Sequence, residues 1–545
     1  MAARRRWGVL AVLVTLTLGA AGACSTGSSP SGASFVPGGT VVFRNSGDFT
    51  SFDIQRDPRG QTQAIAANAY ATLVTLDAAA RVIPYLAKSW KSTPTSITFT
   101  LRNDAKCTDG ALVTPTVAAN SLKRLFEGSV GNLLSPLGGG PFTVRADEAA
   151  GTVTVDSPQP YSGRIAAFAG TGMGVICPAG LGNPALLTTQ MFGAGPYELK
   201  EAVHSDHVTL KLRKDFTWGP GGITAKDLPG TVIYKIVTDE TTAANLLLTG
   251  GLDVGIVNGP DVARLLASDR LHNTVLPNYA VIPMLINQAP GRPGSDVAVR
   301  EAMATAIDPH VWGQLAYGGG HYIASTSFIT PQANCFDQAT AKLVPTPSPE
   351  KARRLLMAAG WTTNAAGQMT KNGQPLTISL VTSPLYPSTG EYMSTQLRTA
   401  GFDVKLTDAD LVTWGQLALA GNFDVTYLNV FQPDAENIVA NKVLFATDPP
   451  LYRTPGSSNF TSVNDPMLNH EASLAKAATG PESCAHWAAF QERLLTQYDY
   501  LPLVSGKSYV FSSKAKKISL TRSRVGCTAL VQPFSSCPMA IPQVP

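Results

Sequence analysis

The stretch LTISLVTSPLYPSTGEYMSTQLRTAGFDVKL, residues 376–406, decides the class of fold. Polar and apolar residues alternate over 376–381 and again over 402–406, which is the pattern of two half-buried strands. The residues between them have the apolar spacing of a helix that ends at Gly401. A strand, a helix and a strand within about thirty residues form a βαβ unit, which implies a parallel sheet and a right-handed crossover. The chain is therefore predicted to have an α/β fold.

The apolar run 423–431 is predicted to be the next strand of that sheet, and polar residues follow it directly. Asp434 and Glu436 are two positions apart, so they could be a catalytic pair, hold a ligand's charge, or cap a helix that begins near 435. Side chains at i and i+2 of a helix start point apart, whereas a hydrolase needs two carboxylates that flank one bond. A secreted hydrolase is therefore only the remote alternative.

The N-terminal residues have the pattern of an export signal. Three arginines precede an apolar run and then small residues up to Cys24. The apolar run is shorter than the ~20 residues of a transmembrane helix, which is the alternative interpretation. The small residues before Cys24 resemble a bacterial lipobox, so the sequence predicts a lipoprotein signal peptide over 1–23, acylation of Cys24, and a flexible tether over 24–37. Cleavage without lipid stays open, because Ala21 occupies the position where leucine is commonest.

Charge and composition limit the function classes. Lys and Arg total 42 against 38 Asp and Glu, but three of the arginines belong to the predicted signal. The rest of the chain is thus nearly neutral, which argues against a nucleic-acid partner. A hydrophobic content of 44% in 545 residues fits a well-packed globular protein with more than one lobe. The residue composition of the chain changes near residue 284.

The cysteines predict disulfide bonds, because an even number remains in an exported chain once Cys24 is set aside. No CxxC spacing occurs, so a thiolate zinc site or a redox motif is not expected. Six free thiols are the alternative. The predicted pairs are Cys107–Cys177, Cys335–Cys484 and Cys527–Cys537.

Motifs of catalysis are absent from the sequence. It contains neither HExxH nor GxSxG. Residues 505–508 resemble the end of a Walker phosphate-binding loop, but the first glycine of that motif is absent. His204 and His207 form the only histidine cluster, in a turn between two predicted strands, and loop polarity explains it better than a metal site. The sequence therefore predicts no enzyme, no cofactor and no metal.

Six stretches, taken in order, resemble the family 5 extracellular solute-binding proteins, which are receptors of ABC importers. Single pieces are weakly specific, but together they cover nearly the whole chain beyond the tether. The stretches are VIPYLAKSW…ITFTLRNDAKCTDGALVTPTVAANSLKRL (82–125), GAGPYEL (193–199), GGLDVGIV (250–257), INQAP…DVAVREAMATAID (286–308), SPEKARRLLMAAGW (348–361) and LRTAGFDVKL (397–406).

This resemblance implies a two-lobed, periplasmic-binding-protein-like fold of type II, cluster C. Lobe I would comprise 38–283, with a subdomain at about 60–190, and a return at 500–545, while lobe II would comprise 284–499. The lobes would close around a short peptide, and the permease subunits of the importer would recognise the closed, monomeric receptor on the outer face of the cell membrane. The alternative cargo is a non-peptide solute such as haem or a metal chelate.

The resemblance also implies where the ligand binds. In peptide-binding members an acid of the second lobe pairs with the α-ammonium of the peptide, and Phe431 occupies that position here. An unpaired buried ammonium is costly, so either Asp434 replaces the acid, or backbone carbonyls do, or the ligand has no amine. The other candidates are more often core or rim residues. Besides Phe431 and Asp434, the ligand-binding candidates are Asn429, Gln432, Gly47, Asp48, Phe49, Trp414 and Tyr317. Asp53 is a further acid in the segment where the first strand of lobe I ends.

Overall fold

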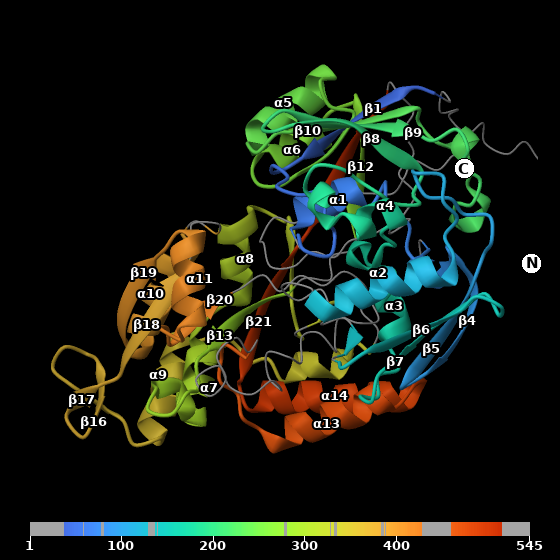
Figure 1. Cartoon of the computed structure of the whole chain (residues 1–545). Coiled ribbons are helices and arrows are strands. Elements are labelled where there is room, and N and C mark those ends of the chain that lie inside the picture. Colours follow the sequence, from blue (N-terminus) through green and yellow to red (C-terminus); the bar gives the residue numbers. More distant parts are fainter. Residues whose placement is uncertain are drawn as a thin grey trace, which may run out of the picture.

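The computed structural model describes most of the chain between residues 38 and 514, and its two largest sheets have seven and six strands (Figure 1). None of the described helices is long and apolar enough to cross a membrane. The described residues are 38–57, 59–77, 81–128, 134, 137–138, 140–276, 281–327, 329–331, 335–382, 386, 388–427 and 459–514.

The seven-stranded sheet lies at the top of Figure 1 and has the order β12-β22-β11-β1-β10-β9-β8. Its central strand β1 is parallel to both β10 and β11, so the carboxyl ends of these three strands lie at one edge. The helices α5 (Glu240–Thr249) and α6 (Asp261–Leu266) follow β10 and β11. The strands are β1 (Thr40–Asn45), β8 (Tyr197–Val203), β9 (His207–Leu212), β10 (Thr231–Ile236), β11 (Val254–Val257), β12 (Leu271–Leu276) and β22 (Ser508–Ser513).

The six-stranded sheet has the order β14-β21-β13-β20-β18-β19 and contains the predicted βαβ unit. Parallel strands β18 and β19 flank helix α10, which ends at Gly401, where φ is 105° and a glycine is favoured. The bounds are β13 (Ile282–Ile286), β14 (Tyr322–Ala324), β18 (Thr377–Thr382), α10 (Thr389–Ala400), β19 (Asp403–Asp408), β20 (Val425–Tyr427) and β21 (Tyr500–Gly506). The α/β class and this unit are thus confirmed, and the end of the strand predicted at 423–431 lies outside the described residues.

A smaller four-stranded sheet, β4-β5-β7-β6, lies at the lower right of Figure 1 with helix α2 (Pro115–Gly128) packed on it. Its strand β5 buries every second residue, as the alternation in the sequence predicted. The strands are β4 (Ala87–Thr93), β5 (Ser96–Leu101), β6 (Thr143–Asp147) and β7 (Thr152–Asp156), and a two-stranded sheet of β2 (Val74–Leu76) and β3 (Val82–Pro84) adjoins them.

The remaining elements are short or lie around the sheets. The helices are α1 (Gly60–Ala66), α3 (Arg164–Ala167), α4 (Pro178–Gly182), α7 (Val297–Ala306), α8 (Pro309–Tyr317), α9 (Pro349–Ala358), α11 (Leu411–Leu419), α13 (Pro466–Ala477) and α14 (Gly480–Thr496). The short strands are β15 (Thr362–Thr363), β16 (Met369–Lys371) and β17 (Gln374–Pro375). The 3-10 turns are η2 (Thr171–Met173), η3 (Pro184–Thr188), η4 (Pro220–Gly222), η5 (Ala225–Asp227), η6 (Pro293–Ser295) and η7 (Gln338–Lys342).

In the order of the described strands, the chain changes from one large sheet to the other between β12 and β13 and back again at Lys507, between β21 and β22. Each sheet has its own buried apolar cluster. Strand β21 pairs with β13 and β14 of the six-stranded sheet, so the return to the seven-stranded sheet begins at Ser508 and not at residue 500. Every residue of β21 is buried, and the strand lies between β14 and β13 in the six-stranded sheet. The division into lobes otherwise stays a prediction.

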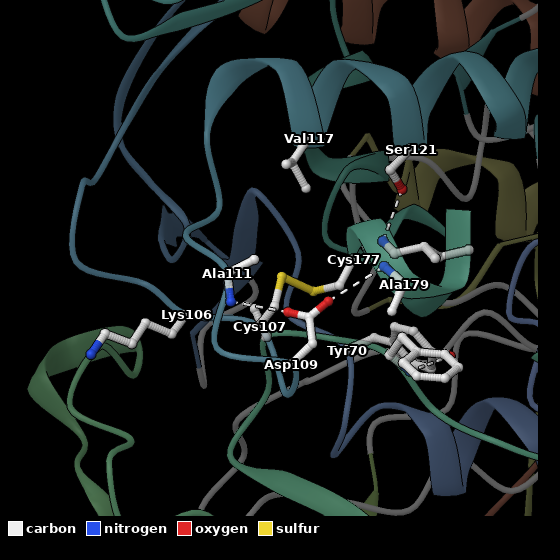
Figure 2. The surroundings of a disulfide bond; sticks show 12 residues. Tyr70, Lys106, Cys107, Asp109, Ala111, Val117, Ser121, Cys177 and Ala179 are labelled. Carbon is white, nitrogen blue, oxygen red and sulfur yellow. Dashed lines mark hydrogen bonds between the residues drawn. A yellow bond between two sulfur atoms is a disulfide. The ribbon is translucent and has the colours of Figure 1, made fainter. Parts of the chain in front are cut away.

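Among the described residues, two disulfide bonds are present, Cys107–Cys177 and Cys335–Cys484, and both have the predicted pairing. Figure 2 shows the first, which joins the segment before α2 to the start of α4. Asp109 spans the same two segments, because its carboxylate accepts from the backbone N–H groups of Ala111 (3.0 Å) and Ala179 (3.3 Å). Cys24, Cys527 and Cys537 lie outside the described residues.

Candidate functional site

The carboxyl ends of the parallel strands define two candidate edges, one on each large sheet. In open α/β sheets, ligands bind outside the carboxyl ends of the strands. The first edge is formed by the ends of β1, β10 and β11, and the second by the ends of β18, β19 and β20. Side chains that follow these ends are therefore the ones to consider for ligand contact.

Arg44 holds the first edge together, and sequence reasoning had missed it. Its buried guanidinium donates to the carbonyl of Val237 after β10 (2.9 Å) and to the carbonyl of Ile256 in β11 (2.5 Å). It also pairs with both carboxylate oxygens of Glu240 at 2.9 Å. A buried charge needs such partners, and these fix the three strand ends relative to one another. An arginine within a strand carries no pattern that would have shown this role.

The loop after β1 contains the predicted residues Gly47, Asp48 and Phe49. Asn45 donates from its side chain to the carbonyl of Gly47 at 2.8 Å, and a Cβ at Gly47 would come within 3.0 Å of the Gln61 side chain. The Asp48 carboxylate accepts from the backbone N–H of Ser205 at 2.9 Å. The loop is therefore tied to the turn between β8 and β9 and has little room for a larger residue at position 47.

Asp53 serves a structural role at the same edge. It is 6% exposed and forms an ion pair with Arg124 of α2, whose guanidinium also donates to Gln55 at 2.8 Å. The carboxylate accepts in addition from the backbone N–H of Gln55 (3.2 Å). These bonds join the loop to α2, so Asp53 has its charge compensated within the protein.

Four aromatic side chains gather near the second edge: Trp312 and Tyr317 of α8, Tyr386, and Tyr427 at the end of β20. The ring centroids of neighbours in this group lie 5.2–5.9 Å apart. Trp312, Tyr386 and Tyr427 are buried and belong to the core, whereas Tyr317 is half-buried. Burial raises the pKa of Tyr317 to about 12, so its hydroxyl stays protonated and neutral near pH 7. Tyr317 is thus the member of this group that a ligand could reach.

Trp414 of α11 is anchored to the second sheet. Its indole N–H donates to the hydroxyl of Thr426 at 2.9 Å, and that hydroxyl donates to the carbonyl of Val381 at 2.7 Å. The side chain is half-buried, and its only polar atom is already used. Trp414 can therefore offer a ligand a held apolar face but no hydrogen bond.

The two bodies that contain the large sheets also touch away from the chain crossings. Ser162 of the smaller subdomain donates from its backbone N–H to the carbonyl of Lys476 (3.0 Å) and from its hydroxyl to the carbonyl of Ala478 (2.7 Å). The neighbouring Tyr161 is buried in a cluster formed mainly by residues of α13 and α14. Figure 1 shows both helices beneath the strands of the four-stranded sheet.

Several predicted ligand residues cannot be placed. Asn429, Phe431, Gln432, Asp434 and the neighbouring Glu436 lie outside the described residues. Among the part of the chain that the structure describes, no three His, Cys, Asp or Glu side chains form a group that could hold a metal ion. Nδ1 of His204 lies 3.2 Å from the carboxylate of Asp48 in the loop after β1, and Nδ1 of His207 lies 3.0 Å from the carboxylate of Asp206.

Comparisons with known proteins point to one family. The family model described as "Bacterial extracellular solute-binding proteins, family 5 Middle" matches residues 81–441. The nickel-binding periplasmic protein of Escherichia coli K12 is 28% identical over 353 residues, which are 62% of this chain and 65% of that protein, slightly less than two thirds of its length.

Two solved structures share the fold across almost the entire chain. A substrate-binding protein of Microbacterium hydrocarbonoxydans, complexed with 4-hydroxybenzoate hydrazide, has a TM-score of 0.71 and 26% identity, with 90% of this chain and 98% of that chain covered. The periplasmic binding protein DppA of Helicobacter pylori, in complex with the peptide STSA, has a TM-score of 0.74 and 17% identity, with 90% and 96% covered. The second likeness concerns the fold alone.

Proposed function

The chain belongs to the bacterial extracellular solute-binding proteins of family 5, and from this premise we propose that it is the receptor of an ABC importer for short peptides. It has the two-lobed α/β fold of its structural relatives, as the sequence resemblance predicted. The observation that carries the proposal is the family match, which extends across residues from both large sheets. Its relatives are binding proteins, which agrees with the prediction that the chain is not an enzyme.

Hinge closure is the mechanism that we propose. In the order of the described strands, the chain changes from one large sheet to the other between β12 and β13 and again between β21 and β22, so rotation of the two bodies about these connections would change the distance between the first and the second edge. A ligand that contacts both edges gains contacts only when they approach, and this differential affinity shifts the population to the closed form. The permease subunits would then take up the ligand from the closed, monomeric receptor.

The export signal places the receptor outside the cytoplasmic membrane in this proposal. The family description is of extracellular proteins, and the small residues before Cys24 have the character of a lipobox. We therefore propose that an acylated Cys24 anchors the chain, with 24–37 as the tether. Two acyl chains hold a protein at a membrane stably, whereas one does not.

A non-peptide cargo is the second candidate, and two observations favour it. Phe431 replaces the expected acid, and one relative binds nickel. A metal chelate brings its own ligand atoms, so it would need few metal-binding side chains from the protein. The described residues of the second edge include the anchored ring of Trp414 and the half-buried ring of Tyr317, which suit either cargo.

A panel of three ligand classes separates these candidates. The purified receptor would be mixed with the tetrapeptide Ser-Thr-Ser-Ala, with Ni²⁺ plus L-histidine, or with 4-hydroxybenzoate hydrazide, and its melting temperature and any co-purified ligand would be measured. A ligand that binds only the folded state raises the melting temperature by mass action. We expect the peptide to do so and co-purified material to be peptide. A rise in melting temperature with the nickel complex alone would favour a metal chelate over a peptide as the cargo. Hydrolysis of the peptide would instead support the remote alternative of a secreted hydrolase.

The role of Asp434 is tested with the same peptide. Asp434→Asn is expected to weaken Ser-Thr-Ser-Ala about tenfold or more, because a hydrogen bond to a charged group contributes roughly 1.5–3 kcal/mol. The N-acetylated peptide, which has no ammonium group, should bind both proteins equally. Glu436→Gln is the matched control for loss of a nearby acid. Equal losses for the free and the acetylated peptide would remove Asp434 from the ammonium role.

A further inference from the structure

Phe49, a predicted ligand residue, is covered by the protein itself. Only 4% of it is exposed. Its ring stacks on Phe52, with centroids 4.9 Å apart, and on His204, with centroids 4.3 Å apart and an angle of 18° between the planes. A ligand that approaches this part of the first edge therefore meets the ring of His204 before it meets Phe49.

Asp48 fixes the orientation of the His204 ring. The Oδ2 atom of Asp48 accepts from the backbone N–H of Ser205 and lies 3.2 Å from Nδ1 of His204. An ionised carboxylate only accepts hydrogen bonds, so Nδ1 must carry the proton of this contact. In the neutral ring the other nitrogen, Nε2, then has a free lone pair. Among the described residues no hydrogen-bonding group contacts Nε2, and 66% of the side chain is exposed.

The turn that carries His204 lies at the first candidate edge, where β1, β10 and β11 end. It joins β8 to β9, and its Asp206 carbonyl accepts from the backbone N–H of Ile236, the last residue of β10, at 2.8 Å. Strand β10 is parallel to β1, so the turn and the loop after β1 lie at the same edge. The Asp48 contact joins the two directly.

We propose that His204, and not Phe49, is the ligand-facing residue at this edge, and that its Nε2 atom accepts a backbone N–H of the bound peptide. Phe49 and Asp48 act as positioning residues, since one supports the imidazole ring and the other selects its tautomer. The inference rests on the proposed peptide-binding function. It adds a ligand contact from the first sheet, at a histidine whose presence in the sequence was explained only by its position in a polar turn.

Chemical modification tests the location of His204. Diethylpyrocarbonate acylates exposed imidazole nitrogens, and peptide mapping by mass spectrometry would follow the reaction at each histidine with and without saturating Ser-Thr-Ser-Ala. We expect bound peptide to slow modification of His204 at least about fivefold and to leave the exposed His272 and His470 unchanged. A peptide that raises the melting temperature but leaves His204 unprotected would overturn this inference and spare the proposed function. If no peptide binds, both the role of His204 and the proposed peptide-binding function are wrong.

Variants test the hydrogen bond. His204→Phe keeps a ring on Phe49 but has no acceptor atom, so it should bind Ser-Thr-Ser-Ala about five- to tenfold more weakly, as loss of one hydrogen bond implies. Analogues of the peptide with one backbone nitrogen methylated provide the decisive comparison. The analogue that is methylated at the nitrogen contacted by His204 should bind the natural protein about five- to tenfold more weakly than the unmethylated peptide does. The same methylation should cause no further loss of affinity for His204→Phe. If His204→Phe binds all of the peptides as the natural protein does, Nε2 makes no contact with the ligand.

Discussion

At the scale of single residues, Asp499 is a carboxyl group in an unusual place. It precedes β21, is 2% exposed, and accepts from the Gln288 side chain at 2.9 Å through Oδ1. Arg300 lies 3.5 Å from the same oxygen, while Oδ2 has no hydrogen-bond partner among the described residues. Burial raises the pKa of Asp499 to about 6, and the nearby arginine opposes this shift only in part.

This shift predicts a pH dependence of stability. An acid whose pKa is higher in the folded state adds stability that is complete below the unfolded pKa near 4 and is lost as the pH rises through about 6. The loss should be on the order of 2–3 kcal/mol. Urea unfolding between pH 4 and 7.5 measures it, and Asp499→Asn should flatten the curve in that window. Asp269→Asn, which changes an exposed acid, is the control, and an unchanged slope in Asp499→Asn would contradict the assignment.

Residues of the candidate site were only partly predictable. The sequence pointed to Gly47, Asp48 and Phe49 because a strand ends there, and the structure does place them at the carboxyl end of β1. It could not show that His204, far away in the chain, covers Phe49, because stacking between two loops leaves no local pattern. Arg44 was missed for the same reason, since its partners Val237, after β10, and Ile256, within β11, lie far from it in the sequence.

At the scale of elements, local signals were reliable and pairing partners were not. Alternation over 376–381 and a glycine at the helix end are properties of a short segment, so the βαβ unit was predictable to within a few residues. The strands β21 and β22 are separated by one residue yet belong to different sheets. Which sheet a strand joins depends on long-range packing, and the predicted boundary at 500 lies eight residues before Ser508, the first residue of β22.

Gly506, the last residue of β21, leads to a prediction about this junction. A Cβ at this position would overlap the ring of Tyr317 in α8. Gly506→Ala should therefore destabilise the protein by about 1–3 kcal/mol, as overpacking usually does. In a Tyr317→Ala background the same substitution should cost less, and a double-mutant cycle by urea unfolding would measure that coupling. Gly319→Ala is the control, because no atom lies within 4 Å of its added Cβ. Additive effects would place the strain elsewhere.

At the scale of the whole molecule, the two bodies are joined where the chain passes from one large sheet to the other and by side-chain and backbone contacts elsewhere. At the Lys507 crossing, its backbone N–H donates to the carbonyl of His321 (2.8 Å) and its ammonium group to the carbonyl of Gly320 (3.0 Å). These bonds attach the crossing to the segment that precedes β14. The contact of Ser162 with the end of α13 is different, because it joins residues that are distant in the sequence from each other and from both crossings.

We expect the Ser162 contact to favour the closed arrangement of the bodies. If the proposed hinge opens, the hydroxyl bond to Ala478 must break or the subdomain must move with α13. Ser162→Ala removes a bond that contributes roughly 1 kcal/mol, so the ratio of open to closed receptor should rise about fivefold without ligand. Small-angle X-ray scattering would detect the larger radius of gyration, and affinity for Ser-Thr-Ser-Ala should fall by up to the same factor.

The exposed Ser92 of β4 provides a matched control in the same subdomain, and Ser92→Ala should leave both measurements unchanged. Unfolding in urea separates the two possible roles of Ser162. A variant that is less stable but has the natural radius of gyration and affinity would show that the contact persists in both arrangements. In that case the four-stranded sheet moves as one unit with α13, and closure involves only the seven-stranded sheet.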